Sequence, residues 1–208
     1  MADAPEFAQP LREQDVDPDP FGQFAVWFDQ ARATGVRMPE AAALATATPD
    51  GMPSVRMVLV KETGPRGFVF YSNYDSRKGR ELAANPRGAL LFYWDPLGRQ
   101  VRIEGEVQRM DEEESAAYIR TRPGGSQLSA LASPQSRPIP SRAWLEQRVE
   151  EFAERYAGAE VPLGDAWGGY RLTPERFEFW QHRENRRHDR LVYTQETRGG
   201  WKVERLAP

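Results

Sequence analysis

The chain has 208 residues, of which 39% are apolar and 28% are charged, and its formal net charge is −3 at pH 7. This composition fits one domain with a buried core and a polar surface. The acidic balance argues against broad nucleic-acid binding, which usually needs a basic surface. Cysteine is absent, which excludes disulfides and thiolate chemistry and fits a cytoplasmic protein. The two histidines lie close together without a cysteine cluster, so we expect no metal site.

The N-terminal residues 1–20 are predicted to form a flexible arm, because proline and aspartate are frequent there and no apolar period appears. This arm lacks the apolar segment of a signal peptide, and no run in the chain reaches the length of a transmembrane helix. We therefore expect no membrane association. Residues 21–208 contain no internal repeat and no linker, so they are expected to form a single domain.

The first half of this domain changes from a helical to a β-like pattern. Asp19-Pro20 and the period of Phe21, Phe24 and Phe28 predict an amphipathic helix that starts at this dipeptide and ends near Gly35. Turn signals then separate short β-like runs. Strands are predicted at 41–48, 53–62, 68–73, 88–94 and 99–110, with a short helix over 76–84.

The second half begins with helices and returns to strands. Helices are predicted over 112–122 and 142–158, capped by Asp111 and Ser141, and the segment 123–141 between them is rich in loop formers. The final strands are predicted at 168–173, 177–181, 190–196 and 201–206. The expected fold class is mainly β (α+β): one antiparallel sheet or barrel with peripheral helices.

Two short basic motifs have both a structural and a functional interpretation. In RMVLVK (56–61), Arg56 and Lys61 are an odd number of positions apart and should face opposite sides of a strand. Taken alone, they are best explained as strand-end charges that reach water. SRKGR (76–80) places cations at a helix start, where free backbone N–H groups favour an anion. An ordinary capped surface helix explains Ser76 equally well.

Further along the chain, RTRPGGSQ (120–127) combines an arginine with Gly-Gly-Ser, which could enclose a phosphate. A plain loop after a helix explains the same composition. SPQSRP (133–138) and Gln100 offer amide groups, and an amide at Gln100 could read the edge of a heteroaromatic ring. None of these patterns is specific by itself.

The segment FEFWQHRENRRHDR (177–190) holds both histidines and a cluster of arginines. Arg186, His188 and Arg190 share one parity, so an extended backbone would direct them to the same place. Three potential cations on one face repel one another unless a negative group lies between them. We therefore interpret this segment as an anion-binding site, with a solvated charged turn as the alternative.

Taken together and in order, these motifs resemble the pyridoxine (pyridoxamine) 5′-phosphate oxidases from about residue 20 to the end. The matching segments are RMVLVK, FYSN with SRKG, LGRQVRIEG, RTRPGGSQ, SPQSR, VPLGDAWGGYR, FEFWQ with HDR, and the terminal ERLAP. The resemblance implies an FMN-binding split β-barrel that forms a homodimer with the flavin at the subunit interface. It also implies oxidation of pyridoxine 5′-phosphate and pyridoxamine 5′-phosphate to pyridoxal 5′-phosphate, with O2 reduced to H2O2.

The resemblance further implies a role for individual residues. Those implied for FMN are Arg56, Met57, Val58, Leu59, Val60, Lys61, Tyr71, Ser72, Arg77, Lys78, Gln100, Gln135, Ser136, Trp180 and Arg190. Those implied for the substrate phosphate are Lys61, Tyr118, Arg122 and Ser126. Arg186 and His188 are the implied catalytic residues and face the substrate ring, where we expect them to orient it more than to act as a general base.

The sequence departs from the family pattern in three places. Arg187 stands where an aliphatic residue is usual, His-Arg follows Gln181 in place of Gly-Gly, and PLREQ replaces an Arg-Arg-Glu-Tyr-like segment. One alternative is a related flavin oxidase for another ring system, such as a phenazine precursor, which would not need the phosphate-binding residues. The other is a non-enzymatic FMN- or pyridoxal-phosphate-binding protein, which would not need both Arg186 and His188.

Overall fold

The computed structural model of the chain describes residues 10–162, 164–197 and 199–208. Their strands form an eight-stranded sheet in the order β3-β2-β1-β4-β5-β6-β7-β8, and an additional β3–β6 pairing closes the first six into a barrel. The strands are β1 (Ala41–Ala47), β2 (Pro53–Gly64), β3 (Gly67–Asn73), β4 (Arg87–Trp94), β5 (Arg99–Arg109), β6 (Trp167–Gln181), β7 (Asp189–Gln195) and β8 (Trp201–Arg205). The predicted split barrel with peripheral helices is therefore confirmed.

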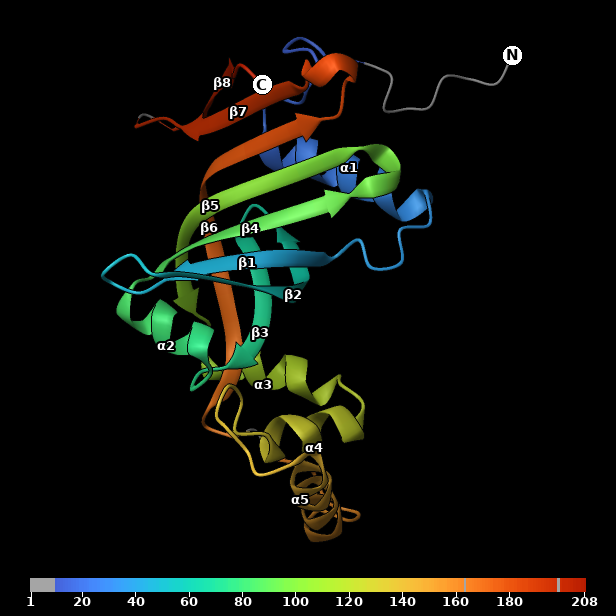
Figure 1. Cartoon of the computed structure of the whole chain (residues 1–208), viewed down its shortest axis with the longest axis vertical. Coiled ribbons are helices and arrows are strands. Elements are labelled where there is room, and N and C mark those ends of the chain that lie inside the picture. The colour runs from blue at the N-terminus through green and yellow to red at the C-terminus, as the bar shows by residue number, and fades with distance from the viewer. Residues whose placement is uncertain (1–9, 163, 198) are drawn as a thin grey trace.

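Helices lie around this barrel. They are α1 (Pro20–Ala33), α2 (Arg77–Ala84), α3 (Glu112–Arg120), α4 (Gly124–Ala132) and α5 (Arg142–Arg155), with 3₁₀ turns η2 (Asp95–Leu97) and η3 (Glu184–Arg186). Figure 1 shows α3, α4 and α5 together at one end of the molecule, and β7 and β8 at the opposite end. None of the helices in the described part of the chain is long and apolar enough to span a bilayer.

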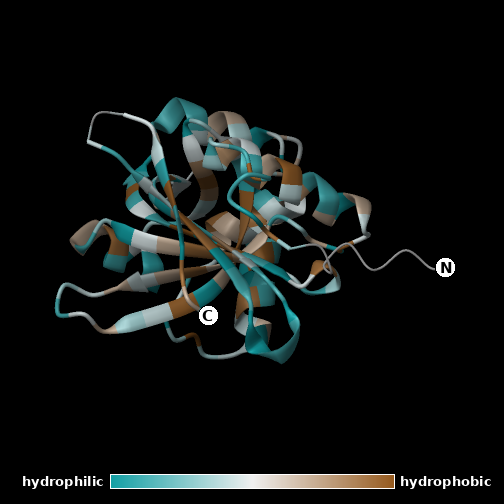
Figure 2. Ribbon diagram, turned by 90° about the horizontal axis from the view of Figure 1, so that it is seen from above, coloured by the Kyte–Doolittle hydropathy of each residue, from teal (hydrophilic) through white to brown (hydrophobic). Residues whose placement is uncertain are grey.

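The core follows from the alternation of apolar side chains along the strands. Val101 and Ile103 of β5 share one parity and are fully buried. Helix α1 begins at its predicted position, with Asp19 as N-cap and Pro20 in the first turn. Its Phe24 ring packs edge-on against barrel aromatics, with ring centroids 4.9 Å apart at Phe68. Figure 2 shows the most hydrophobic stretches on the strands that cross the centre of the molecule.

Two elements differ from the sequence-based prediction. The segment predicted as a loop contains α4 (Gly124–Ala132), which packs against α5, because tertiary contacts outweigh the weak helix propensity of its Gly-Gly start. Strand β6 continues through Pro174, where a break was expected. The pairing with β5 shifts register between Glu104 and Gly105, and proline is tolerated at such a bulge.

The predicted flexible arm falls partly outside the described residues, which begin at Pro10. From there the chain is held against β7 and β8. The Leu11 amide donates to Asp189 (3.1 Å), and its carbonyl accepts from Arg205 (2.7 Å). The carbonyl of Asp17 accepts from the hydroxyl of Tyr193 (2.7 Å). The packed part of the chain therefore begins before the boundary expected at residue 21.

Candidate active site

A cleft of about 720 Å³ opens between the end of β3, helices α4 and α5, and the start of β6. It brings together several residues from separate predicted motifs. The predicted site residues in its wall are Tyr71, Ser72, Arg122, Ser126 and Gln135. Tyr118 and Lys78 contact this wall from α3 and α2. We call these seven residues together with Trp167 the helical half-site.

Aromatic stacking fixes one side of this half-site. Tyr118 lies on Tyr71 with ring centroids 3.7 Å apart and an interplanar angle of 14°. Trp167 continues the stack 5.7 Å from Tyr71, and the Arg122 guanidinium lies 5.0 Å from the Trp167 centroid. One terminal nitrogen of Arg122 is buried without a hydrogen-bond partner among the described residues. An unpaired buried donor is costly, so this nitrogen favours an anionic ligand.

Lys78 is the buried cation of the half-site. Its ammonium donates to Ser72 Oγ (3.0 Å), Gln135 Oε1 (2.9 Å) and Ser76 Oγ (3.3 Å), all of them neutral oxygens. Burial lowers the pKa of Lys78 to about 8, and the neighbouring positive charge of Arg56 acts in the same direction. Ser76 is also the N-cap of α2. The capping role expected for Ser76 is thus confirmed, and the buried ammonium adds a charge suited to an anion at the same helix start.

Arg56 and Lys61 of β2 lie in different surroundings. The guanidinium of Arg56 donates to the Leu44 carbonyl (3.1 Å) and to Thr46 Oγ1 (2.6 Å), so its interpretation as a strand-end charge reaching water is wrong. Lys61 falls at a bulge, since Val60 pairs with Phe70 before the register shifts. A bulge can change the direction of a side chain, so parity alone does not fix the side that Lys61 faces.

The rest of the RMVLVK strand presents apolar side chains to solvent. Val55 is 68% exposed, Met57 64% and Leu59 40%. Across the sheet, Met57 and Leu91 both pair with the small Ala43 of β1, so they form a continuous apolar strip. Large exposed apolar patches of this kind mark association surfaces.

A second group of predicted residues lies in one row across β5, β6 and β7. Gln100 pairs with Trp180, and Trp180 pairs with Arg190. The His188 ring packs on Trp180 with centroids 4.6 Å apart. We call Gln100, Trp180, Arg186, His188 and Arg190 the strand half-site. Register therefore brings together residues predicted for the cofactor that lie far apart in the sequence.

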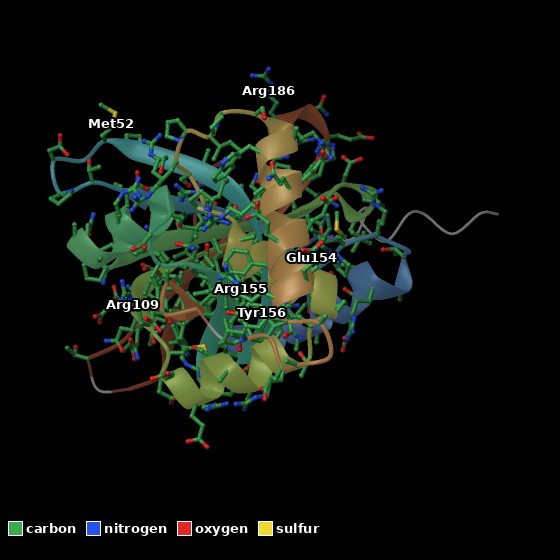
Figure 3. The ribbon with its side chains drawn as sticks, turned by 90° about the horizontal axis from the view of Figure 1, so that it is seen from below. Met52, Arg109, Glu154, Arg155, Tyr156 and Arg186 are labelled. Atoms are coloured by element: carbon green, nitrogen blue, oxygen red, sulfur yellow. The ribbon has the colours of Figure 1, made fainter. Side chains whose placement is uncertain are left out.

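The parity argument for three convergent cations is wrong. Asn185 and Arg186 have positive φ values of 55° and 58° in η3, so the backbone is not extended there. Arg186 is exposed and points away from the rest of the chain (Figure 3). Arg190 donates to Glu178 (2.8 Å), so a carboxylate of the chain itself supplies its counter-charge. The charge repulsion expected from this segment thus does not require a bound anion.

The two half-sites lie far apart within one chain. Trp167 and Trp180 stand at opposite ends of β6, separated by roughly 40 Å of strand at about 3.3 Å per residue. Figure 1 shows these ends at opposite ends of the barrel. One copy of the chain therefore does not bring Arg122 and Ser126 to His188.

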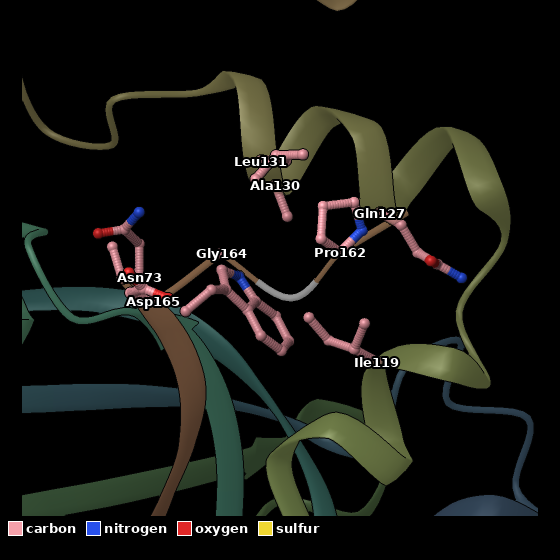
Figure 4. Close-up of a pocket in the computed structure, with 10 residues that line it drawn as sticks. Asn73, Ile119, Gln127, Ala130, Leu131, Pro162, Gly164 and Asp165 are labelled. Atoms are coloured by element: carbon pink, nitrogen blue, oxygen red, sulfur yellow. The ribbon is translucent and has the colours of Figure 1, made fainter. Parts of the chain in front are cut away.

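A smaller cavity of about 260 Å³ lies beside the cleft, between Ile119, Leu131 and Pro162 (Figure 4). It shares Asn73, Ala130 and Trp167 with the cleft. Its described lining is mainly apolar and includes the acid Asp165 but no cation. This cavity is therefore unsuited to a phosphate.

Three residues of these sites were not predicted from the sequence. Trp167 forms part of the aromatic stack, and Glu81 and Glu178 are buried carboxylates that bind predicted site arginines. The spacing of Glu81, four residues after Arg77 in a predicted helix, was the available signal. The alternation that places Glu178 on the same side as Trp180 was another.

Comparisons with known proteins show the family of the chain. The pyridoxamine 5′-phosphate oxidase model matches residues 28–156, and the pyridoxine 5′-phosphate oxidase C-terminal dimerisation region matches residues 167–208. The chain is 58% identical to a pyridoxine/pyridoxamine 5′-phosphate oxidase of Rubrobacter xylanophilus, covering 95% of this chain and 91% of the relative. The identity to the enzyme of Bordetella petrii is 54%, with 95% and 93% covered.

Among solved structures, PhzG from Burkholderia lata in complex with tetrahydrophenazine-1-carboxylic acid superposes with a TM-score of 0.90 at 32% identity, covering 97% of this chain and 99% of PhzG. An FMN-binding protein of Nostoc punctiforme shares the fold at a TM-score of 0.71 and 16% identity, with 95% and 98% covered. The resemblance found in the sequence is thus confirmed: the chain belongs to the pyridoxine/pyridoxamine 5′-phosphate oxidase family.

Proposed function

We propose that this protein oxidises pyridoxine 5′-phosphate and pyridoxamine 5′-phosphate to pyridoxal 5′-phosphate, with FMN as cofactor and O2 as the final acceptor. The strongest support for this proposal comes from the environment of Arg122. Its buried nitrogen, which has no hydrogen-bond partner within the described part of the chain, lies in the wall of a cleft that also contains Ser126. A guanidinium with a nearby hydroxyl is suited to a phosphate monoester. Lys61 and Tyr118 complete the proposed grip on the substrate phosphate.

The residues present also fit a flavin nucleotide. The ammonium of Lys78 at the start of α2, whose hydrogen-bond partners among the described residues are all neutral, suits the FMN phosphate. Gln100, Trp180 and Arg190 form a row of amide, indole and guanidinium groups that suits a flat heteroaromatic ring. When bound, the flavin supplies the redox chemistry, accepting a hydride from C4′ and passing electrons to O2.

The remaining residues proposed for FMN come from β2, the end of β3, the start of α2 and the segment between α4 and α5. They are Arg56, Met57, Val58, Leu59, Val60, Lys61, Tyr71, Ser72, Arg77, Gln135 and Ser136.

For the substrate, the protein mainly has to hold and orient the ring. The phosphate-binding residues hold one end of the substrate, and His188 and Arg186 are proposed to act at its other end, near C4′. The His188 ring is held by Trp180 and by a hydrogen bond from the Arg183 amide to Nδ1 (3.1 Å). A fixed imidazole positions a substrate group without being a strong base.

We further propose that the active protein is a homodimer in which each site uses the helical half-site of one copy and the strand half-site of the other. Three observations support this: the separation of the half-sites along β6, the exposed apolar strip around Met57, and the matched dimerisation region. Symmetric pairing would cover the strip and create two equal sites.

The similarity to PhzG makes a phenazine-type substrate the second candidate. The phosphate-binding pair Arg122 and Ser126 disfavours this candidate, because a tetrahydrophenazine carboxylate has no phosphate ester.

The direct test is to load the purified protein with FMN, add pyridoxine 5′-phosphate in air, and follow pyridoxal 5′-phosphate formation. We expect repeated turnover. An FMN-loaded protein without turnover would contradict the oxidase proposal and leave a carrier or another substrate.

A further inference from the structure

Glu81 is a charged side chain buried at the centre of a hydrogen-bond network. It lies on α2 and is 5% exposed. Its Oε1 accepts from Arg77 Nε (2.8 Å), and its Oε2 accepts from Arg56 (3.2 Å). The hydroxyls of Thr46 and Ser54 also donate to Oε2. One carboxylate thus links α2 to the neighbouring strands β1 and β2.

This carboxylate is ionised despite its burial. Burial alone would raise the pKa of Glu81, but the hydrogen bonds from Ser54, Thr46, Arg77 and Arg56 outweigh it and lower the pKa to about 2. A buried ion pair is a poor source of stability, since apolar residues of similar volume often serve as well. The network therefore calls for a role beyond stability, and both of its arginines belong to the proposed FMN site.

The two arginines are held in different ways. Arg77 donates to Glu81 through its Nε, so with respect to residues 10–162, 164–197 and 199–208 its terminal nitrogens stay available at the same helix start as Lys78. The Arg77 side chain is 56% exposed, and without Glu81 it would sample many rotamers that a ligand would have to order. The terminal nitrogens of Arg56 are bonded to the chain itself, so Arg56 contributes a fixed charge.

We propose that Glu81 is a positioning residue for the phosphate of the flavin cofactor: it fixes Arg77 and Arg56 so that a phosphate at the start of α2 meets guanidinium groups already in place. This inference rests on the proposed FMN-dependent function and assigns Glu81 a role within it. Glu81 acts through the arginines and not by contact with the phosphate.

An alternative role for Glu81 predicts the opposite change in FMN affinity. A carboxylate close to a phosphate also repels it, so a Glu81 that only competed with the ligand would weaken FMN binding, and Glu81→Gln would then tighten it. Both oxygens of Glu81 are already occupied by donors, two of them guanidinium groups. The negative charge is therefore largely compensated, and the loss of orientation outweighs the relief of repulsion.

The experiment compares FMN with riboflavin, which has the same ring but no phosphate. Dissociation constants for both flavins are measured by quenching of flavin fluorescence on the flavin-free protein. For Glu81→Gln we expect FMN to bind about tenfold more weakly, the effect of one charge-assisted hydrogen bond, and riboflavin affinity to stay unchanged. Ser54→Ala, which removes one donor to Glu81, should shift FMN affinity in the same direction by less.

Glu175→Gln is the matched control, because Glu175 forms an exposed ion pair with Arg87. This substitution should change neither the FMN affinity nor the riboflavin affinity. Unchanged or tighter FMN binding in Glu81→Gln would overturn the inference, as would an equal loss for both flavins. If Glu81→Gln does not fold, the same comparison of FMN affinity with riboflavin affinity in Ser54→Ala tests the inference. A wild-type protein that binds neither flavin would overturn the proposed function itself, a result distinct from these.

Discussion

The backbone N–H of Arg183 donates a hydrogen bond of 3.1 Å to Nδ1 of His188. Because Nδ1 accepts, the neutral imidazole carries its proton on Nε2. The ring also packs on Trp180, 4.6 Å away between centroids. The departure from the family pattern at His182-Arg183 therefore still provides an amide that orients His188.

The change His188→Asn tests this assignment. Asparagine keeps an acceptor near the position of Nδ1 but has no group at Nε2. We expect kcat to fall by about 10²-fold, the size of a positioning defect, while FMN affinity changes little. Steady-state kinetics and flavin titration measure the two quantities. An unchanged kcat would remove His188 from the site.

The change Arg122→Met tests the substrate grip. Losing a bidentate charge-assisted contact costs about 2 kcal/mol, so KM for pyridoxine 5′-phosphate should rise about 30-fold, with a smaller effect on kcat. Arg120→Met serves as the control, since Arg120 is exposed and pairs with Glu160. Equal kinetics for the two variants would contradict the assignment of Arg122.

The pH dependence of FMN binding tests Lys78. Burial, and then the charge of Arg56, lower its pKa to about 8, so above pH 8 the flavin-free protein holds a neutral amine that must take up a proton to meet a phosphate. FMN affinity should therefore be greatest below pH 8 and fall by up to about tenfold per pH unit above it. Titrations from pH 7 to 9.5 measure this affinity. Riboflavin binding to the wild type and FMN binding to Lys78→Met should not change with pH over this range. A flat FMN profile in the wild type would refute the role.

The change Val55→Glu tests the association surface. A charge in the exposed apolar strip should oppose pairing of two copies, so light scattering should show a monomer, and oxidase activity should be lost with it. Val26→Glu, on the solvent side of α1, introduces the same charge at a position that is 51% exposed and should leave a dimer. A dimeric, active Val55→Glu variant would place the interface elsewhere.

Much of the fold could be predicted from local patterns, and the parts that could not depend on tertiary contacts. The caps at Asp19 and Ser76 mark helix starts directly in the sequence. Helix α4 was missed because its packing on α5 outweighs a composition typical of loops. In the site, the convergence of Arg186 and His188 was inferred from a two-residue period, which fails where η3 interrupts the extended backbone.

The pairing of distant segments also could not be predicted from local sequence patterns. The row of Gln100, Trp180 and Arg190 depends on the register of three strands, and no short-range signal fixes that register. The same holds for Glu81, whose partners Thr46 and Ser54 belong to strands far from α2 in the sequence.

We propose above that each oxidase site is shared between two copies of the chain. The most direct test is a heterodimer of an Arg122→Met subunit and a His188→Asn subunit, isolated with two different tags. In a shared arrangement one site carries both changes and the other carries neither, so we expect about half of the wild-type activity per dimer. Activity no greater than that of the two parent variants would contradict the shared site.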